Sequence, residues 1–114
     1  MKILEIVSGL GLNGAIVHAR ALSRELAVRG HDVTVLCRPG SWMASALRGE
    51  AVDVWESHLH TWPLGELRRI AALIRAADID IVHTHMTDAH FFGTVLMWFC
   101  DVPVVATAHS RRMQ

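Results

Sequence analysis

The chain has 114 residues, of which 52% are hydrophobic, and its 11 basic and 11 acidic residues leave no formal net charge. This length and composition predict one globular domain that buries roughly 65% of the surface of its unfolded form, and the balanced charge excludes a general electrostatic surface for nucleic acid. Two cysteines, Cys37 and Cys100, are too few for a disulfide scaffold or a four-cysteine zinc site, and a reduced, cytoplasmic setting fits them best.

The first third of the chain predicts a strand, a helix and a second strand. Residues 2–7 form an apolar run interrupted by Glu5, which indicates a buried strand and excludes the core of a signal peptide. A helix is predicted to begin near Asn13 and to end at Gly30. Its apolar face consists of Ile16, Ala19, Leu22 and Leu26. The second strand covers 32–37.

The rest of the chain continues the alternation of helices and strands. The predicted elements are a short helix over Met43–Leu47, a strand over Val52–Trp55, a helix from Pro63 to Asp78, a strand over Asp80–Thr84, a helix capped by Thr87 or Asp88, and a strand over Val102–Thr107. The apolar run Phe91–Cys100 is too short to cross ~30 Å of hydrocarbon and belongs to a core helix. We therefore predict an α/β fold, a Rossmann-like three-layer sandwich with a parallel sheet of about five strands in the order 3-2-1-4-5 and helices on both faces.

A glycine-rich turn joins the first strand to the first helix. Gly9, Gly11 and Gly14 bring backbone N–H groups to the positive end of a helix, which favours an anion such as phosphate. Their spacing also matches the dinucleotide fingerprint, but the second strand runs into Cys37 and Arg38 where NAD binding requires an acidic residue. Two alternatives stay open, NADP binding and a tight turn with a helix cap at Asn13 that binds nothing.

Ligands of open parallel sheets bind at the carboxyl ends of the strands, where the strand order reverses. In this chain the reversal lies between the strand at 2–7 and the strand at 80–84. The residues delivered to that rim are the glycine turn, Cys37-Arg38, His83–Asp88 and Ala108-His109-Ser110.

Eight histidines raise the question of a metal site. His83 and His85 share one face of a strand and are spaced to hold one ion, but Asp88 and His90 are displaced toward a helix start. We therefore predict no metal and interpret His83 as a hydrogen-bonded residue at a strand end and Asp88 as a helix cap. His58 and His60 are predicted to lie at the surface.

Several segments together resemble the amino-terminal domain of family 4 glycosyltransferases of the GT-B fold. That family has a glycine pair, a helix, R-G-H-[DE]-V-x-V, D-[IV]-V-H-x-H and P-[VI]-V-x-T-x-H in this order. The corresponding segments are Asn13-Gly14-Ala15, Arg29–Val35, Asp80–His85 and Pro103–His109. The resemblance spans almost the whole chain. The departures are Asn13, where the family usually has a first glycine, and Ser110, where it often has another.

The resemblance implies a retaining, metal-independent transfer of a sugar from a nucleotide-sugar, without a cofactor, to an acceptor glycan or lipid. The implied donor-binding residues are Asn13, Gly14 and Ala15, whose N–H groups would stabilise charge on the departing diphosphate. His109 is the implied catalytic residue, although a capping or packing role stays open. The implied acceptor-binding residues are Gly11, His85 and Asp88.

The family's second, donor-binding domain and the last part of its first domain have no counterpart here. We therefore expect an incomplete amino-terminal, acceptor-side domain that is inactive alone, because a two-domain enzyme closes its cleft around the donor. The alternatives are an NADP-binding oxidoreductase domain and a non-catalytic interaction domain. The sequence identifies neither donor nor acceptor.

Two surfaces suggest further partners. A last strand rich in Val104 and Val105 would offer an edge for a homo-oligomer or for a missing half supplied in trans. Exposed Trp42 or Trp62 near Arg68-Arg69 would give peripheral contact with an inner membrane that carries a lipid-linked acceptor.

Overall fold

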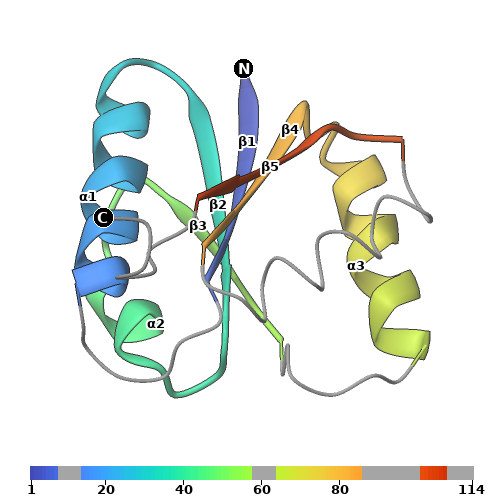
Figure 1. Ribbon diagram of the computed structural model, residues 1–114, viewed down its shortest axis with the longest axis horizontal. Coiled ribbons are helices and arrows are strands. Elements are labelled where there is room, and N and C mark those ends of the chain that lie inside the picture. The colour runs from blue at the N-terminus through green and yellow to red at the C-terminus, as the bar shows by residue number, and fades with distance from the viewer. Residues whose placement is uncertain (8–13, 58–63, 86–100, 108–114) are drawn as a thin grey trace.

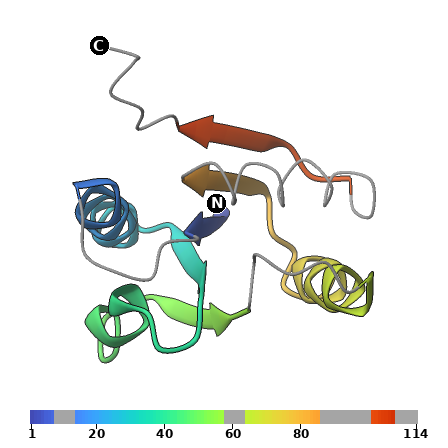
Figure 2. The same cartoon turned by 60° about the horizontal axis from the view of Figure 1, so that its bottom comes forward.

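The computed structural model describes residues 1–7, 14–57, 64–85 and 101–107. Its elements are β1 (Lys2–Val7), α1 (Gly14–Val28), β2 (Asp32–Cys37), α2 (Trp42–Ala46), β3 (Asp53–Glu56), α3 (Leu64–Ala76), β4 (Ile81–His85) and β5 (Val104–Thr107). The sheet has five strands in the order β3-β2-β1-β4-β5, and every neighbouring pair is parallel (Figures 1 and 2). The predicted fold class and strand order are confirmed. The helix predicted to follow Thr87 or Asp88 lies outside the described residues.

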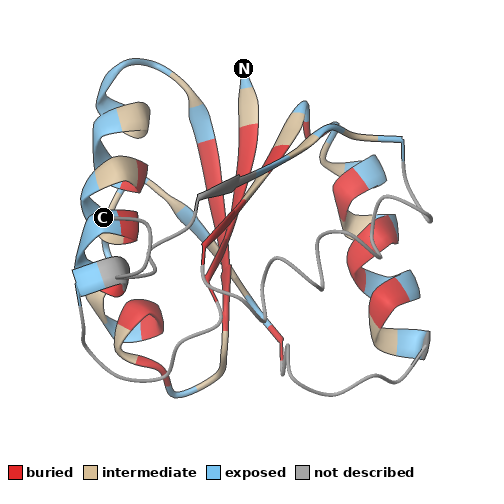
Figure 3. Ribbon diagram, in the orientation of Figure 1, coloured by how far each residue is buried: buried red, intermediate tan, exposed pale blue. Residues whose placement is uncertain are grey.

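The helices lie on both faces of the sheet. Figure 2 shows α1 and α2 on one face and α3 on the other, and Figure 3 shows that the helices turn their buried residues toward the strands. One core cluster joins strand residues such as Leu4, Ile6 and Val82 to α3. A second joins Val35 and Cys37 to α1 and α2. The alternation of side chains along each strand separates the two clusters and gives the predicted three layers.

Local sequence sets the helix ends. Gly30 has φ 94°, and His31 donates its backbone N–H to the carbonyl of Leu26 at 3.1 Å, so glycine ends α1 as predicted. Asp78 takes the same role after α3 at φ 55°, an angle at which a short polar side chain is tolerated. In α2, the hydroxyl of Ser41 accepts a hydrogen bond from the N–H of Ala44 at 3.2 Å.

Some element boundaries differ from the prediction. The short helix, the third strand and the fourth strand are each displaced by one residue, and β5 begins at Val104 rather than Val102. Pro103 precedes β5 because proline has no N–H for the ladder, although its carbonyl accepts a bond from Val82 at 2.9 Å.

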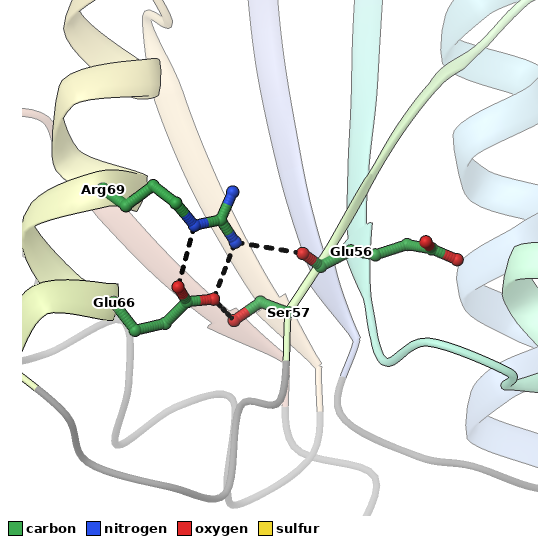
Figure 4. Close-up of polar contacts among 4 residues, drawn as sticks. All are labelled: Glu56, Ser57, Glu66 and Arg69. Carbon is green, nitrogen blue, oxygen red and sulfur yellow. Dashed lines mark hydrogen bonds and ion pairs between the residues drawn. The ribbon is translucent and has the colours of Figure 1, made fainter.

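A polar cluster joins the end of β3 to the first turns of α3 (Figure 4). The guanidinium of Arg69 donates two hydrogen bonds to Glu66, at 2.8 and 2.7 Å, and one to the carbonyl of Glu56 at 3.1 Å. Ser57 donates its hydroxyl to the same Glu66 carboxylate. The hydrogen bonds to Glu66 raise the pKa of Arg69. The cluster therefore holds the end of β3 against the first turns of α3.

Candidate functional site

Four strands end together at one rim of the sheet. In the register of the ladders, Val7 lies beside Cys37 and beside His85, and His85 lies beside Thr107. The strand order reverses between β1 and β4, as the sequence predicted for the ligand-binding rim.

Helix α1 begins with Gly14, the first described residue after the glycine-rich turn. Gly14 is exposed, and a Cβ placed on it would meet no atom of the described residues within 4 Å. The first N–H groups of a helix have no partner within the helix and carry its positive dipole end. Among the described residues, none covers the start of α1 at Gly14, whose N–H groups are thus candidates for contact with a ligand. Of Ala15 only the helical backbone is described, and Gly11 and Asn13 lie outside the described residues.

A buried cluster of one carboxylate and two imidazoles bridges β1 and β4, just before the rim. The backbone pairs Glu5 with His83 across the two strands, and His85 follows two residues later on the same face. His85 Nε2 lies 2.6 Å from Glu5 Oε1, and His83 Nδ1 lies 3.3 Å from Glu5 Oε2. The Glu5 and His85 side chains are fully buried and His83 is 16% exposed.

The cluster lies on the face of the sheet that α1 covers. Leu4 and Ile6, which flank Glu5, belong to the cluster packed on α3, so Glu5 points the other way. The ring of His18, on α1, lies 6.4 Å from the ring of His85 in an edge-on arrangement. Helix α1 therefore begins at Gly14 and, one turn later at His18, lies beside the histidines of β4.

The two histidines keep Glu5 ionised. Burial raises the pKa of a carboxyl group, but hydrogen bonds from His83 and His85, together with their charges, outweigh burial and lower the pKa of Glu5 below its usual 4.5. A buried charge is tolerated only where it is paired and hydrogen-bonded. Glu5 meets that condition through residues 78 and 80 positions away along the chain.

This arrangement tests the interpretation of the histidines. His83 is a hydrogen-bonded strand residue, as predicted. His85, predicted to bind an acceptor, is fully buried and contacts Glu5. Sequence reasoning missed Glu5 as a site residue, although a lone acid inside an apolar strand is a signal that a buried partner exists. His58, His60 and Asp88 lie outside the described residues.

Cys37 is the last residue of β2 at the same rim, and Arg38 follows it. Burial raises the pKa of the Cys37 thiol to about 11, against the opposing effect of a hydrogen bond with Ser41. A thiol of this kind is inert at neutral pH, so Cys37 is a packing residue rather than a nucleophile. His109 lies outside the described residues, two positions after the end of β5 at this rim.

The prediction that Trp42 is exposed near Arg68-Arg69 is wrong. Its ring packs against the core cluster under α1 and α2, with the Arg20 guanidinium 5.9 Å from the ring centre. Arg69 lies on α3, on the opposite face of the sheet. Trp62 lies outside the described residues, and peripheral membrane contact stays a prediction. In the described part of the chain, no helix is both long and apolar enough to span a membrane.

The last strand, β5, bears on the predicted homo-oligomer. It is a border strand in the described sheet, and Val105 is 47% exposed, whereas Val104 packs partly against the α3 cluster. An accessible strand border favours pairing with another chain, and the predicted homo-oligomer stays a prediction.

Comparison with known protein families identifies the family of this chain. Residues 12–113 match the model of Glycosyltransferase Family 4. The chain belongs to this family. An uncharacterised glycosyltransferase of Methanocaldococcus jannaschii is 27% identical over 108 residues, which cover 87% of this chain and 27% of that protein.

Solved structures of other proteins have a fold similar to that of this chain. Anabaena HepE in complex with UDP-glucose has a TM-score of 0.74 at 16% identity, over 93% of this chain and 28% of HepE. Acinetobacter baumannii MurG has a TM-score of 0.72 at 14% identity, over 95% of this chain and 35% of MurG. A Rickettsia africae glycosyltransferase has a TM-score of 0.71 at 17% identity, over 92% and 28%. The family 4 chain thus spans about a third or less of the length of these relatives.

Proposed function

We propose that this family 4 chain is the amino-terminal, acceptor-side part of a retaining glycosyltransferase that moves a sugar from a nucleotide-sugar to an acceptor glycan or lipid. The observation that carries the proposal is the rim at which β1, β4 and β5 end beside the start of α1, where no described residue crowds Gly14. Family membership and the UDP-glucose complex of the similar HepE support a nucleotide-sugar as the donor.

The proposed donor contacts follow from the start of α1. Backbone N–H groups at Asn13, Gly14 and Ala15 would face the diphosphate, where they stabilise the charge that develops as it leaves. A glycine at position 14 leaves room for the donor to approach the backbone. His109, two residues beyond β5, is the proposed catalytic residue, whose imidazole would orient a sugar hydroxyl. The transfer step itself needs no metal ion and no cofactor.

The acceptor would lie against Gly11, Asp88 and the end of β4. Because His85 is fully buried, its proposed contribution is to shape this part of the rim from below rather than to contact the acceptor directly. Glu5 holds the ring of His85 through the 2.6 Å contact and so fixes its orientation.

We expect no transfer by this chain alone. Acceptor-side residues without the donor-binding part of such an enzyme neither enclose the donor nor exclude water from the reacting bond. Incubation of the chain with a nucleotide-sugar and measurement of released nucleotide diphosphate tests this, and any turnover above the buffer rate would contradict it. We place the enzyme in the cytoplasm.

Binding experiments separate the candidate functions. Titration of isotope-labelled chain with UDP-glucose is expected to shift amide signals near residues 7, 14, 37, 85 and 107, at the carboxyl rim. NADPH in a parallel titration tests the oxidoreductase alternative, which would shift the same signals at lower concentration. A chain that shows no affinity for any nucleotide or sugar would be a non-catalytic interaction domain. Shifts confined to the opposite rim, near Asp32 and Asp80, would also refute the proposal.

A further inference from the structure

The cluster of Glu5, His83 and His85 has the composition of a metal site that spacing along the sequence does not reveal. One oxygen and two ring nitrogens, one from each side chain, lie within 4.8 Å of one another. The sequence offered two of these ligands, two residues apart on β4. The third comes from β1, through strand pairing.

The geometry is close to that of a bound ion. With metal–ligand bonds of roughly 2.1 Å and tetrahedral angles, neighbouring ligand atoms lie about 3.4 Å apart. Glu5 Oε1 lies 3.3 Å from His83 Nδ1, which already fits, and 2.6 Å from His85 Nε2, so this second pair must move apart by about 0.8 Å. All three ligands stand on β1, the central strand of the described sheet, and on its neighbour β4, which hold them in place.

The charge balance also favours a cation. Glu5 is fully buried and is the acidic member of the three ligands, and an imidazole binds a metal ion through a neutral ring nitrogen. A divalent ion between the three ligands would neutralise the buried carboxylate. His83, at 16% exposure, gives the ion a path from solvent.

We propose that Glu5, His83 and His85 bind one divalent transition-metal ion of the zinc class, which joins β1 to β4 beneath the rim. Two histidines and one carboxylate form a known ligand set for Zn²⁺, with the fourth position left to water. The ion is structural and takes no part in sugar transfer, so this inference does not depend on the proposed function.

The test uses the chain without a histidine tag, stripped with EDTA and dialysed against micromolar Zn²⁺. We expect about one zinc per chain by elemental analysis, a rise of several degrees in Tm on Zn²⁺ addition, and visible absorption from Co²⁺ in a site of low symmetry. Absence of stoichiometric binding in the micromolar range would overturn the proposal and leave the cluster as a hydrogen-bond network.

Substitutions assign the binding to this cluster. Glu5→Gln and His83→Asn are each expected to weaken Zn²⁺ binding at least 100-fold, and His83→Asn guards against a folding defect because its ring is partly exposed. His31→Asn, at the opposite rim beside the start of β2, is the matched control and is expected to bind as the wild type does. Equal affinity in all three variants would place the zinc elsewhere and refute the site.

Discussion

Glu5→Gln tests how much of the fold depends on the buried carboxylate. The change keeps the shape of the side chain and removes its charge. The 2.6 Å contact with the fully buried His85 and the 3.3 Å contact with His83 then become uncharged hydrogen bonds. A hydrogen bond to a charged group contributes about 1.5–3 kcal/mol and loss of one partner of a buried pair costs about 3–5 kcal/mol. Because glutamine keeps part of the bonding, we expect a loss of about 2–4 kcal/mol in the free energy of unfolding.

That loss is large for a chain of this size. At about 0.05–0.15 kcal/mol per residue, 114 residues correspond to a stability of roughly 6–17 kcal/mol. Urea unfolding of both proteins in EDTA, followed by circular dichroism, measures the difference free of any metal contribution. The matched control is Glu25→Gln, which removes the same charge from an exposed pair with Arg29 at 2.9 Å, where the expected loss is at most about 0.5 kcal/mol.

The pH dependence gives the prediction a second readout. Although burial acts to raise it, hydrogen bonds and charges of the histidines hold the pKa of Glu5 below its usual 4.5. A lowered pKa in the folded chain stabilises it above the unfolded value, and this contribution disappears as the pH falls through the folded value. The gap between wild type and Glu5→Gln is therefore expected to be full at neutral pH and to close below pH 4.5. A gap under about 0.5 kcal/mol at neutral pH, or one that stays constant into acid, would refute the reasoning.

Three further substitutions or modifications test other parts of the structure. Arg69→Lys loses the two-pronged bond to Glu66 and should cost about 0.5–1 kcal/mol in urea unfolding; an unchanged midpoint would show that the cluster is not stabilising. The Cys37 thiol, with its pKa raised to about 11, should react with iodoacetamide at least 100-fold more slowly in folded than in unfolded chain, as peptide mass spectrometry can measure, and equal rates would contradict its burial. Gly30→Ala forces a Cβ onto φ 94° and should cost about 1 kcal/mol in thermal unfolding, whereas Gly65→Ala inside α3 should be neutral or stabilising; the reverse order would contradict the assigned helix end.

Local patterns predicted the frame of this fold well. The apolar runs on either side of Gly30 predicted β1, α1 and β2 close to their observed bounds. They did so because the spacing of apolar residues in helices and strands, and the left-handed conformation of a glycine at a helix end, depend only on a few neighbouring residues. The alternation of elements then gave the strand order, since parallel strands require right-handed crossovers. Displacements of one residue in β3 and β4 reflect hydrogen-bond partners in neighbouring strands, which local patterns do not contain, whereas α2 begins at Trp42 because Ser41 caps it.

The candidate site was harder to predict than the frame. Glu5 is an ordinary interruption of an apolar run until the sheet pairs it with His83, 78 residues later. The same pairing explains why His85 is buried rather than presented at the rim. Trp42 was misassigned for a related reason, because its side chain packs partly buried against the core cluster shared by β1, β2, α1 and α2, a contact that depends on the assembled layers.

The affinity of Gly14→Leu for UDP-glucose, measured beside that of Gly65→Leu, tests the proposed donor site most directly. Both glycines lie in the first turn of a helix, and a Cβ at either position meets no atom within 4 Å in the described part of the chain, so both variants are expected to fold. Only position 14 lies at the rim proposed to receive the diphosphate. We predict that Gly14→Leu binds at least ten-fold more weakly than the wild type while Gly65→Leu binds normally. Equal affinity in the two variants would contradict the assignment of the donor to the start of α1.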